Sequence, residues 1–398
     1  MRMISIALIS LMIVLSLPGR ATTEVTKGKI RKVKNPIANQ YIVVLKDEVA
    51  SDTKAVAQNL ALAHGGLIRF YYEHALKGFS VRLTEQAALA LSRNPLVAFV
   101  EQDGEMESSG VQVNPPNWGL DRIDQRDLPY DGLYSYAAEG TGVNAYVIDS
   151  GITYNHPEFG GRALLGADLV EDNNFPRGAD CVGHGTSVAG ILGGATFGVA
   201  KQVKLYSVRV SKCTNGRADR SVFLAGMDWV TLNHKKPAVA NISINAGCAD
   251  IAECQQLSSV DMAAEALIAA GVTVVASAGN NEGLVDTSPA RVASAITVGA
   301  VTNTDRRVGG TAYGDSVDLF APGYEVVTAA NYGGTTLFSY TSAAAPHVAG
   351  AVALYLQTHP AATPSQVQQY IVNTATFGKV RNIPSFSGTP NRLLYIQP

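Results

Sequence analysis

Residues 340–357 read YTSAAAPHVAGAVALYLQ, a serine followed by small and apolar residues. Alanine packs closely and has the highest helix propensity, so the stretch predicts a buried helix that begins near Ser342. We expect Pro346 in its first turn, where the missing N–H would have no partner in any case. The serine then lies at a helix amino end, where free N–H groups favour negative charge nearby. It is either an ordinary helix cap or a nucleophile.

The chain around this helix alternates between apolar strands and helical stretches from Asn114 to Pro398. This alternation predicts an α/β fold with a doubly wound parallel sheet. Two predicted strands end in polar residues: GVNAYVIDSG (142–151) carries Asp149, and GVTVVASAGNNEG (271–283) carries Asn280. Ligands bind at the carboxyl ends of such strands, which makes both side chains candidates for a site.

A candidate base for Ser342 lies in GHGTSVAGIL (183–192), where His184 stands between two glycines at the start of another small, apolar helix. Glycine neighbours let backbone and substrate approach closely. Taken singly, Asp149 may be called structural, His184 a packed histidine and Asn280 a turn residue. Together they predict a nucleophile, a base, a group that orients the base, and an oxyanion donor.

These stretches resemble the subtilisin-like serine proteases, most closely the proteinase K and aqualysin group. The order Asp149, His184, Ser342 is the subtilisin order. The resemblance runs from about Trp118 to the C-terminal region, and it implies a sheet of subtilisin type. It includes SVRV (207–210), AGMDWV (225–230), SPARVASAITVGA (288–300) and VDLFAPG (317–323).

The resemblance implies a role for each candidate residue. Ser342 would attack the peptide carbonyl, His184 would act as general base and then acid, and Asp149 would orient the imidazole. Asn280 and the backbone N–H of Ser342 would form the oxyanion hole. The substrate-binding residues would be Ser243, Ile244 and Asn245, which hold the peptide as an added strand and line the primary specificity pocket.

The chain departs from the family pattern at several positions. Tyr340 stands where glycine is usual, and Ala343 where methionine is usual. Asn245 and Ala246 replace two glycines, so a side chain at Asn245 would shrink or polarise the pocket. These changes motivate an alternative function, that of a weakened or inactive homologue that binds peptide without cleaving it.

The amino terminus predicts export. Residues 1–21, MRMISIALISLMIVLSLPGRA, combine an early arginine, an apolar segment and small residues, as in a signal peptide. The apolar run is short for a membrane span, and the rival interpretation is a buried or anchoring helix. We therefore expect a secreted, extracellular protein.

Residues 22–108 predict a separate unit with the order strand, helix, strand, strand, helix, strand. This order indicates a small ferredoxin-like α+β domain. It resembles the inhibitory propeptide of the same family, which implies a zymogen that cleaves itself; a permanent accessory domain is the alternative. Residues 109–398 would form the peptidase domain.

Composition limits the partners. The chain has 398 residues, of which 46% are hydrophobic, and a formal net charge of −2 at pH 7. It gives no electrostatic reason to expect nucleic acid. We expect a protein or peptide substrate, the propeptide as an intramolecular inhibitor, no membrane partner after signal removal, and a monomer.

Four cysteines in an exported chain predict two disulfides, for which three pairings exist. The resemblance to the aqualysin group implies Cys181–Cys213, and Cys248–Cys254 would then close a short loop. The alternative is zinc, but the sequence lacks C-x-x-C and H-E-x-x-H spacings.

A structural calcium ion is also implied by the resemblance, with no cofactor for catalysis. The matching ligands are the backbone carbonyls of Ala293 and Ala295 and the carboxylate of Asp318, and oxygen ligands suit this hard cation. The alternative for Asp318 is a capping or turn carboxylate.

Overall fold

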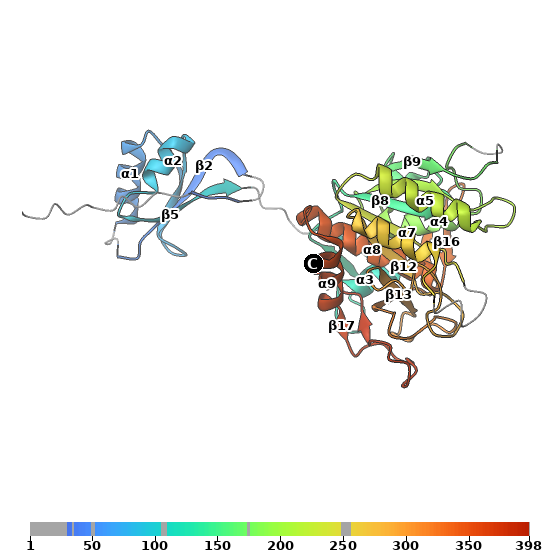
Figure 1. Cartoon of the computed structure of the whole chain (residues 1–398). Helices are drawn as coiled ribbons and strands as arrows, with labels where there is room; N and C mark the ends of the chain where they lie inside the picture. Colours follow the sequence, from blue (N-terminus) through green and yellow to red (C-terminus); the bar gives the residue numbers. More distant parts are fainter. Residues whose placement is uncertain are drawn as a thin grey trace, which may run out of the picture. The chain divides into compact units, whose positions relative to one another are not determined.

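The computed structural model describes residues 30–33, 36–48, 52–104, 110–172, 176–247 and 256–397. The chain divides into two compact units, Met1–Glu107 and Ser108–Pro398 (Figure 1). The expected signal segment 1–21 and the expected Cys248–Cys254 pair lie outside the described residues.

The first unit is a five-stranded sheet in the order β1-β5-β2-β4-β3 with two helices. Its apolar core includes Val43, Phe79 and Val100, all with no exposed surface. The predicted ferredoxin-like order is confirmed, with a short additional strand β1 paired with β5. The elements are β1 (Ile30–Arg31), β2 (Pro36–Leu45), α1 (Thr53–Ala63), β3 (Leu67–Tyr72), β4 (Gly78–Arg82), α2 (Glu85–Leu91) and β5 (Val97–Gly104).

The second unit contains a nine-stranded sheet in the order β17-β18-β14-β13-β12-β11-β8-β10-β9. From β9 to β14 all neighbouring strands are parallel, and the order runs in opposite directions from β8, which confirms the doubly wound sheet. Its strands are β8 (Asn144–Asp149), β9 (Ala163–Asp168), β10 (Lys204–Arg209), β11 (Ala238–Ile242), β12 (Thr273–Ser277), β13 (Ile296–Val301), β14 (Leu319–Pro322), β17 (Thr376–Phe377) and β18 (Arg392–Leu393).

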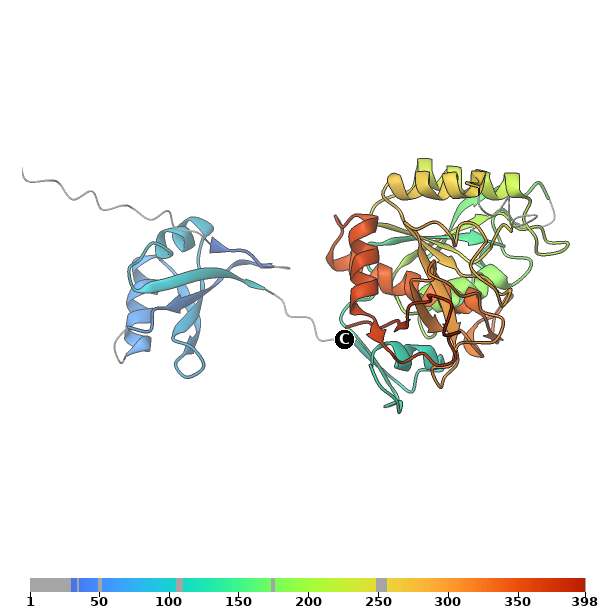
Figure 2. The same ribbon diagram turned by 60° about the horizontal axis from the view of Figure 1, so that its bottom comes forward.

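Helices cover both faces of this sheet (Figure 2). Helices α4 and α8 pack on one face, and α5 and α7 on the other, each with its own apolar cluster. The helices of this unit are α3 (Trp118–Ile123), η1 (Pro157–Phe159), α4 (His184–Gly193), α5 (Arg220–Asn233), α7 (Ser259–Ala269), α8 (Thr341–Thr358) and α9 (Pro364–Thr374). Two hairpins complete it: β6 (Gly110–Val113) with β7 (Leu133–Tyr136), and β15 (Val326–Ala329) with β16 (Thr335–Phe338).

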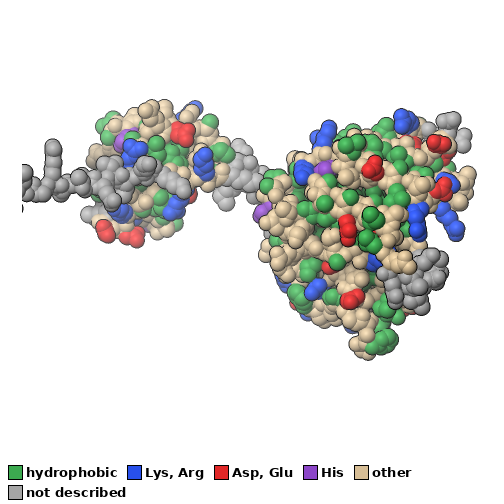
Figure 3. Space-filling view, in the orientation of Figure 1, with side chains coloured by type: hydrophobic (Ala, Val, Ile, Leu, Met, Phe, Trp, Pro, Cys, Tyr) green, Lys and Arg blue, Asp and Glu red, His purple; other side chains and the backbone are tan. Residues whose placement is uncertain are grey.

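The surface carries charges of both signs. On the face drawn in Figure 3, lysine and arginine side chains are scattered among aspartate and glutamate side chains. This distribution agrees with the net charge of −2. Among the described residues, no helix has both the length and the apolar character needed to cross a membrane.

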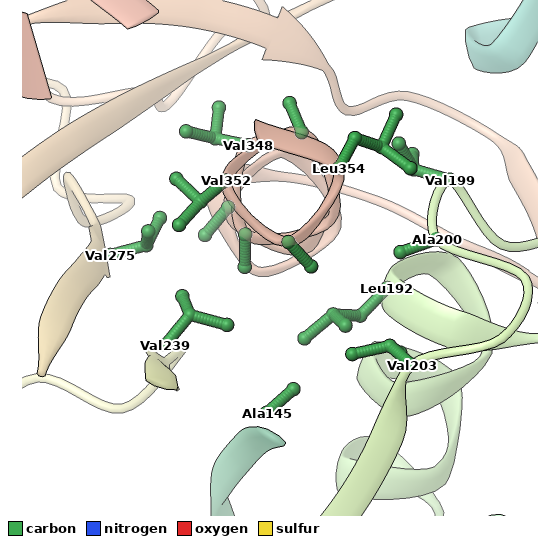
Figure 4. Packing of buried hydrophobic residues seen from close by; sticks show 14 of the residues in the cluster. Ala145, Leu192, Val199, Ala200, Val203, Val239, Val275, Val348, Val352 and Leu354 are labelled. Atoms are coloured by element: carbon green, nitrogen blue, oxygen red, sulfur yellow. The ribbon is translucent and has the colours of Figure 1, made fainter. Parts of the chain in front are cut away.

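Helix α8 lies in the centre of the larger core. Figure 4 shows it nearly end-on, with Val352 directed towards Val239 and Val275 of strands β11 and β12, and Val348 one helical turn away in the same apolar cluster. All four side chains have no exposed surface. The predicted buried helix is therefore confirmed, and its small residues let it lie close to the sheet.

The start of α8 differs from the prediction in two details. The helix begins at Thr341 with Tyr340 as its N-cap, so Ser342 is not the helix cap. Pro346 is the sixth residue of the helix and not part of its first turn. Because proline has no N–H, the carbonyl four residues earlier, that of Ser342, loses its helical partner. It instead accepts a hydrogen bond from Ser243 Oγ at 3.4 Å.

Candidate active site

Asp149 ends β8, a strand in the middle of the sheet whose six residues are all buried. Its Oδ1 atom lies 2.8 Å from His184 Nδ1 and accepts the backbone N–H of Ser150 at 2.7 Å. Since a carboxylate accepts, His184 Nδ1 carries the proton in this pair. The structure thus brings the first two predicted site residues into direct contact, with His184 Nε2 left as the basic nitrogen.

His184 is the first residue of α4, and its glycine neighbours have structural reasons. Gly183, the N-cap, adopts φ 98°, which a side chain would strain. A Cβ atom on Gly185 would lie 2.2 Å from the carbonyl oxygen of Gly151. The imidazole itself is 31% exposed, so it is accessible to a ligand.

The environment of His184 raises its pKa above 6.5. Burial alone would lower the pKa, because it disfavours the charged imidazolium. The charge of Asp149, the hydrogen bond to it and the charge of Asp180 act in the opposite direction and outweigh burial. The site therefore favours a histidine that accepts a proton.

Asp180 was not singled out by the sequence analysis, although it organises the approach to α4. Its side chain is 2% exposed and accepts five hydrogen bonds from the loop and the first turn of the helix. The donors are Ser150 Oγ (2.9 Å), Val182 N (2.9 Å), Gly183 N (2.9 Å), Thr186 N (2.8 Å) and Thr186 Oγ1 (2.6 Å). The available signal was the position of Asp180 four residues before His184, at the start of the helix, because aspartates at helix starts and turns accept hydrogen bonds from the N–H groups that follow them.

Ser342 lies at the amino end of α8, near the His184 end of α4. The two helices pack together, and the ring of Phe338, just before α8, meets the His184 ring edge-on at 5.2 Å. In this structure Ser342 Oγ donates to the carbonyl oxygen of Ser243 at 3.3 Å. Among the described residues it makes no hydrogen bond to His184, so this predicted contact is not formed here.

Asn280 follows β12 and is joined to the residue before Ser342. Its Oδ1 atom accepts the N–H of Thr341 at 3.2 Å and the Thr341 hydroxyl at 2.8 Å. Because Thr341 holds the Oδ1 atom of Asn280, the Nδ2 group is directed away from Thr341. It donates a hydrogen bond to none of the described residues. Asn280 is exposed, so these N–H groups are accessible to a ligand.

The three predicted substrate-binding residues follow β11. Ser243 contacts Ser342 through the two hydrogen bonds given above. Ile244 packs against the core on the α5 and α7 face. Asn245 directs its Nδ2 group to the carbonyl oxygen of Ser277, at 3.1 Å.

One predicted disulfide is present. Cys181 and Cys213 are bonded, with Cα atoms 5.3 Å apart, and they tie the loop before α4 to the loop after β10. Cys181 directly follows Asp180, so the bond fastens the segment that positions His184.

The oxygens expected to bind calcium converge on the side-chain amide of Gln368. The carbonyl oxygens of Ala293 and Ala295 both accept from Gln368 Nε2, at 3.0 and 3.1 Å. Burial raises the pKa of Asp318 to about 6, against hydrogen bonds from Thr297 N–H and the Gln368 side chain. The oxygens fit the chemistry of calcium, but the Gln368 amide must leave before a cation enters. The sequence analysis did not anticipate this residue of α9.

Comparison with known proteins identifies the family. A model described as "Subtilase family" matches residues 140–390, more than half of the chain. The chain belongs to the subtilase family. A second model, "Peptidase inhibitor I9", matches residues 40–109 of this subtilase, which includes the first unit from β2 to its end.

The relatives of this subtilase include an "Extracellular serine proteinase" of Thermus sp. (strain Rt41A), 47% identical over 83% of this chain and 78% of the relative. An "Alkaline serine exoprotease A" of Vibrio alginolyticus is 40% identical over 90% of this chain and 67% of the relative. A solved "cold adapted subtilisin-like serine proteinase" has a TM-score of 0.64 and 45% identity, covering 70% of this chain and 97% of the other.

These findings confirm the predicted family, the fold and the activity class. The subtilase is a serine endopeptidase made as a zymogen with an I9 propeptide. They give no support to the alternative of an inactive, peptide-binding homologue.

Proposed function

We propose that Ser342 is the nucleophile of this endopeptidase, His184 its general base and Asp149 the group that orients the base. The observation that carries the proposal is the 2.8 Å contact between Asp149 Oδ1 and His184 Nδ1. It fixes the tautomer in which Nε2 accepts a proton. The Ser342 hydroxyl turns from the Ser243 carbonyl towards Nε2 when substrate binds, since catalytic hydrogen bonds commonly tighten only in the complex.

The reaction then proceeds through an acyl-enzyme. Ser342 Oγ bonds to the peptide carbonyl carbon as its proton passes to His184 Nε2. The carbonyl oxygen becomes an oxyanion that Asn280 Nδ2 and the Ser342 N–H stabilise, and both donors are at hand because Asn280 Oδ1 is held by Thr341. The imidazolium gives its proton to the leaving amine as the peptide C–N bond breaks. Water then attacks the acyl-enzyme carbonyl carbon while His184 takes its proton. The bond to Ser342 Oγ breaks, the serine regains its proton from His184, and the carboxylic acid product leaves.

Substrate would bind as an extended strand beside residues 243–245. This segment follows β11 and belongs to no strand, so its backbone is open to pairing. Its first residue contacts Ser342 through the Ser342 Oγ to Ser243 O bond. A peptide paired here would therefore place a carbonyl beside the nucleophile.

Secretion and maturation belong to the same proposal. The similar Thermus protein is named extracellular, and we assign residues 1–21 as signal peptide, 22–108 as propeptide and 109–398 as a monomeric peptidase. Intact mass of the active secreted protein should begin near residue 109. If the segment 22–108 remained covalently attached in active material, it would be an accessory domain.

We also propose that calcium binds at Ala293, Ala295 and Asp318 when the Gln368 amide withdraws. Their oxygens converge on one nitrogen, which supports a cation site, and a bound ion stabilises the folded state by mass action. Excess calcium should raise the melting temperature of Ser342→Ala protein, and Gln368→Ala should enlarge that rise by removing the competitor. A melting temperature that calcium and EDTA leave unchanged in both proteins would contradict this site.

The catalytic assignment is tested by comparing the wild-type protein with Ser342→Ala on casein and on a chromogenic peptide. Loss of the nucleophile should lower kcat by roughly 10⁶-fold. The matched control is Ser339→Ala, which changes a serine three residues away. Equal hydrolysis by wild-type and Ser342→Ala proteins would overturn the assignment.

A further inference from the structure

Two segments that follow neighbouring strands of the sheet both reach the start of α8. Strands β11 and β12 are parallel neighbours, and the chain continues from them as residues 243–247 and 278–280. Both segments reach the start of α8: Ser243 O accepts from Ser342 Oγ, and Asn280 Oδ1 accepts from Thr341. The nucleophile thus lies at the mouth of the gap between them.

This position decides which part of a substrate enters the gap. If Ser342 attacks a peptide carbonyl whose oxygen points to Asn280, the residue bearing that carbonyl lies directly over the gap. Its side chain is then the one directed between the two segments. This step rests on the proposed function, since it assumes Ser342 as nucleophile and Asn280 as oxyanion donor.

The Asn245 side chain crosses the gap. It comes from the β11 side and donates from Nδ2 to the carbonyl oxygen of Ser277, at the end of β12, at 3.1 Å. A Cβ atom on Gly279, in the opposite segment, would lie 3.3 Å from the same nitrogen. One residue farther, Ala246 and Ser288 exchange two backbone hydrogen bonds of 2.8 and 2.9 Å. The gap is therefore short and partly filled.

The atoms that remain in it are polar and unsatisfied. Asn245 Oδ1 and Thr287 Oγ1 are both buried, and neither has a hydrogen-bond partner among the described residues. Thr287 Oγ1 would lie 3.6 Å from a Cβ atom on Gly279, so it borders the same space as the amide. Buried polar atoms without partners are costly, and a ligand that donates a hydrogen bond removes that cost.

We propose that Asn245 is a specificity-determining residue, and that this endopeptidase cleaves after small residues that carry a hydrogen-bond donor, serine before others. The bulk of Asn245 excludes a large aromatic side chain. Asn245 Oδ1 and the Thr287 hydroxyl are closed to solvent in the free protein, so the Asn245 amide turns when substrate binds, and the two groups then recognise a small hydroxyl. The departure from glycine at position 245 thereby becomes the determinant of substrate choice.

The test compares peptide p-nitroanilides that differ only in serine, alanine or phenylalanine before the scissile bond. For the wild-type enzyme, kcat/KM for serine should exceed that for phenylalanine by at least ~10-fold, the size of effect that a pocket of limited volume produces. Asn245→Gly should raise the phenylalanine-to-serine ratio by at least ~10-fold.

Two matched variants separate bulk from polarity. Asn245→Leu keeps a similar volume without the amide, so phenylalanine should stay excluded while the preference for serine over alanine disappears. Thr287→Val keeps the shape without the hydroxyl and should reduce the same preference. Alanine cleaved as well as serine by the wild-type enzyme would overturn the polar part of the proposal.

Active-site labelling distinguishes the possible failures. Each protein is titrated with diisopropyl fluorophosphate, which labels a reactive serine and presents no side chain to the gap, with Ser342→Ala as the blank. A fully labelled Asn245→Gly protein with the wild-type phenylalanine-to-serine ratio would overturn the role of Asn245. A wild-type protein that takes no label would instead contradict the catalytic role of Ser342.

Discussion

The amino ends of α4 and α8 carry the proposed base and the proposed nucleophile of this subtilase, and they are built in different ways. At α4, glycine occupies the N-cap with positive φ, and the five hydrogen bonds to Asp180 hold the preceding loop and the first turn. At α8, Tyr340 is the N-cap with φ 73° and ψ −166°, and its side chain makes no capping hydrogen bond. The proposed base is thus fixed by buried hydrogen bonds to one carboxylate, whereas the proposed nucleophile is placed by the packing of its helix and by hydrogen bonds to Ser243 and Asn280.

This difference indicates which substitutions the amino ends of α4 and α8 tolerate. Polar networks fail when one member is removed, because the remaining groups stay buried without partners. A helix held by apolar packing tolerates changes at its first residues, since α8 is anchored by side chains such as Val348 and Val352. We therefore expect that, among substitutions that leave Ser342 in place, those on the α4 side have the larger effects.

Apart from the loss of Ser342 itself, the largest expected effect is the removal of the disulfide beside Asp180. The Cys181→Ser, Cys213→Ser double variant, in the Ser342→Ala background that prevents autolysis, should lose about 3 kcal/mol of unfolding free energy, since the bond closes a loop of 32 residues. Urea unfolding measures it. Reduction of the parent protein should give at least this loss, since it would also break the expected Cys248–Cys254 bond, and an unchanged unfolding midpoint of the double variant would show that Asp180 alone holds the loop.

The second effect is on catalysis. Asp180→Asn replaces a buried acceptor of five hydrogen bonds and should displace His184, lowering kcat/KM by about 100-fold. The pH midpoint of kcat/KM should also fall, because the charge of Asp180 raises the pKa of His184. Asp219→Asn, an exposed aspartate paired with Lys212, is the matched control. A variant with lower activity but the wild-type midpoint would limit Asp180 to a structural role.

The third effect tests the α8 side. The backbone of Tyr340 lies in a region that glycine alone adopts freely, so Tyr340→Gly should be about 1 kcal/mol more stable than Tyr340→Ala, which keeps the strain and removes the ring. Thermal unfolding in the Ser342→Ala background measures the difference. Equal stabilities would mean that the α8 end is not strained.

The smallest expected effect is on pH dependence. Acylation needs neutral His184, so kcat/KM should rise with pH around a midpoint above 6.5, the direction in which Asp149 and Asp180 move the pKa. For folding the sign is opposite: the raised pKa contributes stability below about pH 6.5 that is lost as pH rises through the folded-state value. An NMR titration of His184 in Ser342→Ala protein with a midpoint below 6.5 would contradict both statements.

Much of the fold could be predicted from patterns along the chain. Strand β8 (NAYVID, 144–149) has four consecutive hydrophobic residues before its polar end, and such a run is typical of a strand buried on both faces of a parallel sheet. The contact between Asp149 and His184 also followed, since the resemblance supplied the pairing and the sheet edge supplied a place for it.

Other features depend on side-chain directions that no local pattern encodes. Gln368 lies on the surface of α9, about fifty residues beyond Asp318, and only the packing of α9 places its amide on two distant carbonyls. Asn245 was noted as a departure from glycine, but not the atom to which its amide is bonded. Pro346 was expected in the first turn because propensity disfavours it elsewhere, whereas tertiary packing retains it inside the helix.

The proline inside α8 also connects recognition with reactivity. Because Pro346 leaves the Ser342 carbonyl without a helical donor, that carbonyl is tethered sideways to Ser243, and the Ser342 hydroxyl is tethered to the same residue. A peptide that pairs with residues 243–245 would therefore lie beside both hydrogen bonds. We expect substrate binding at this segment to be coupled to the rotation of the Ser342 hydroxyl towards His184, because the free protein holds that hydroxyl on the Ser243 carbonyl.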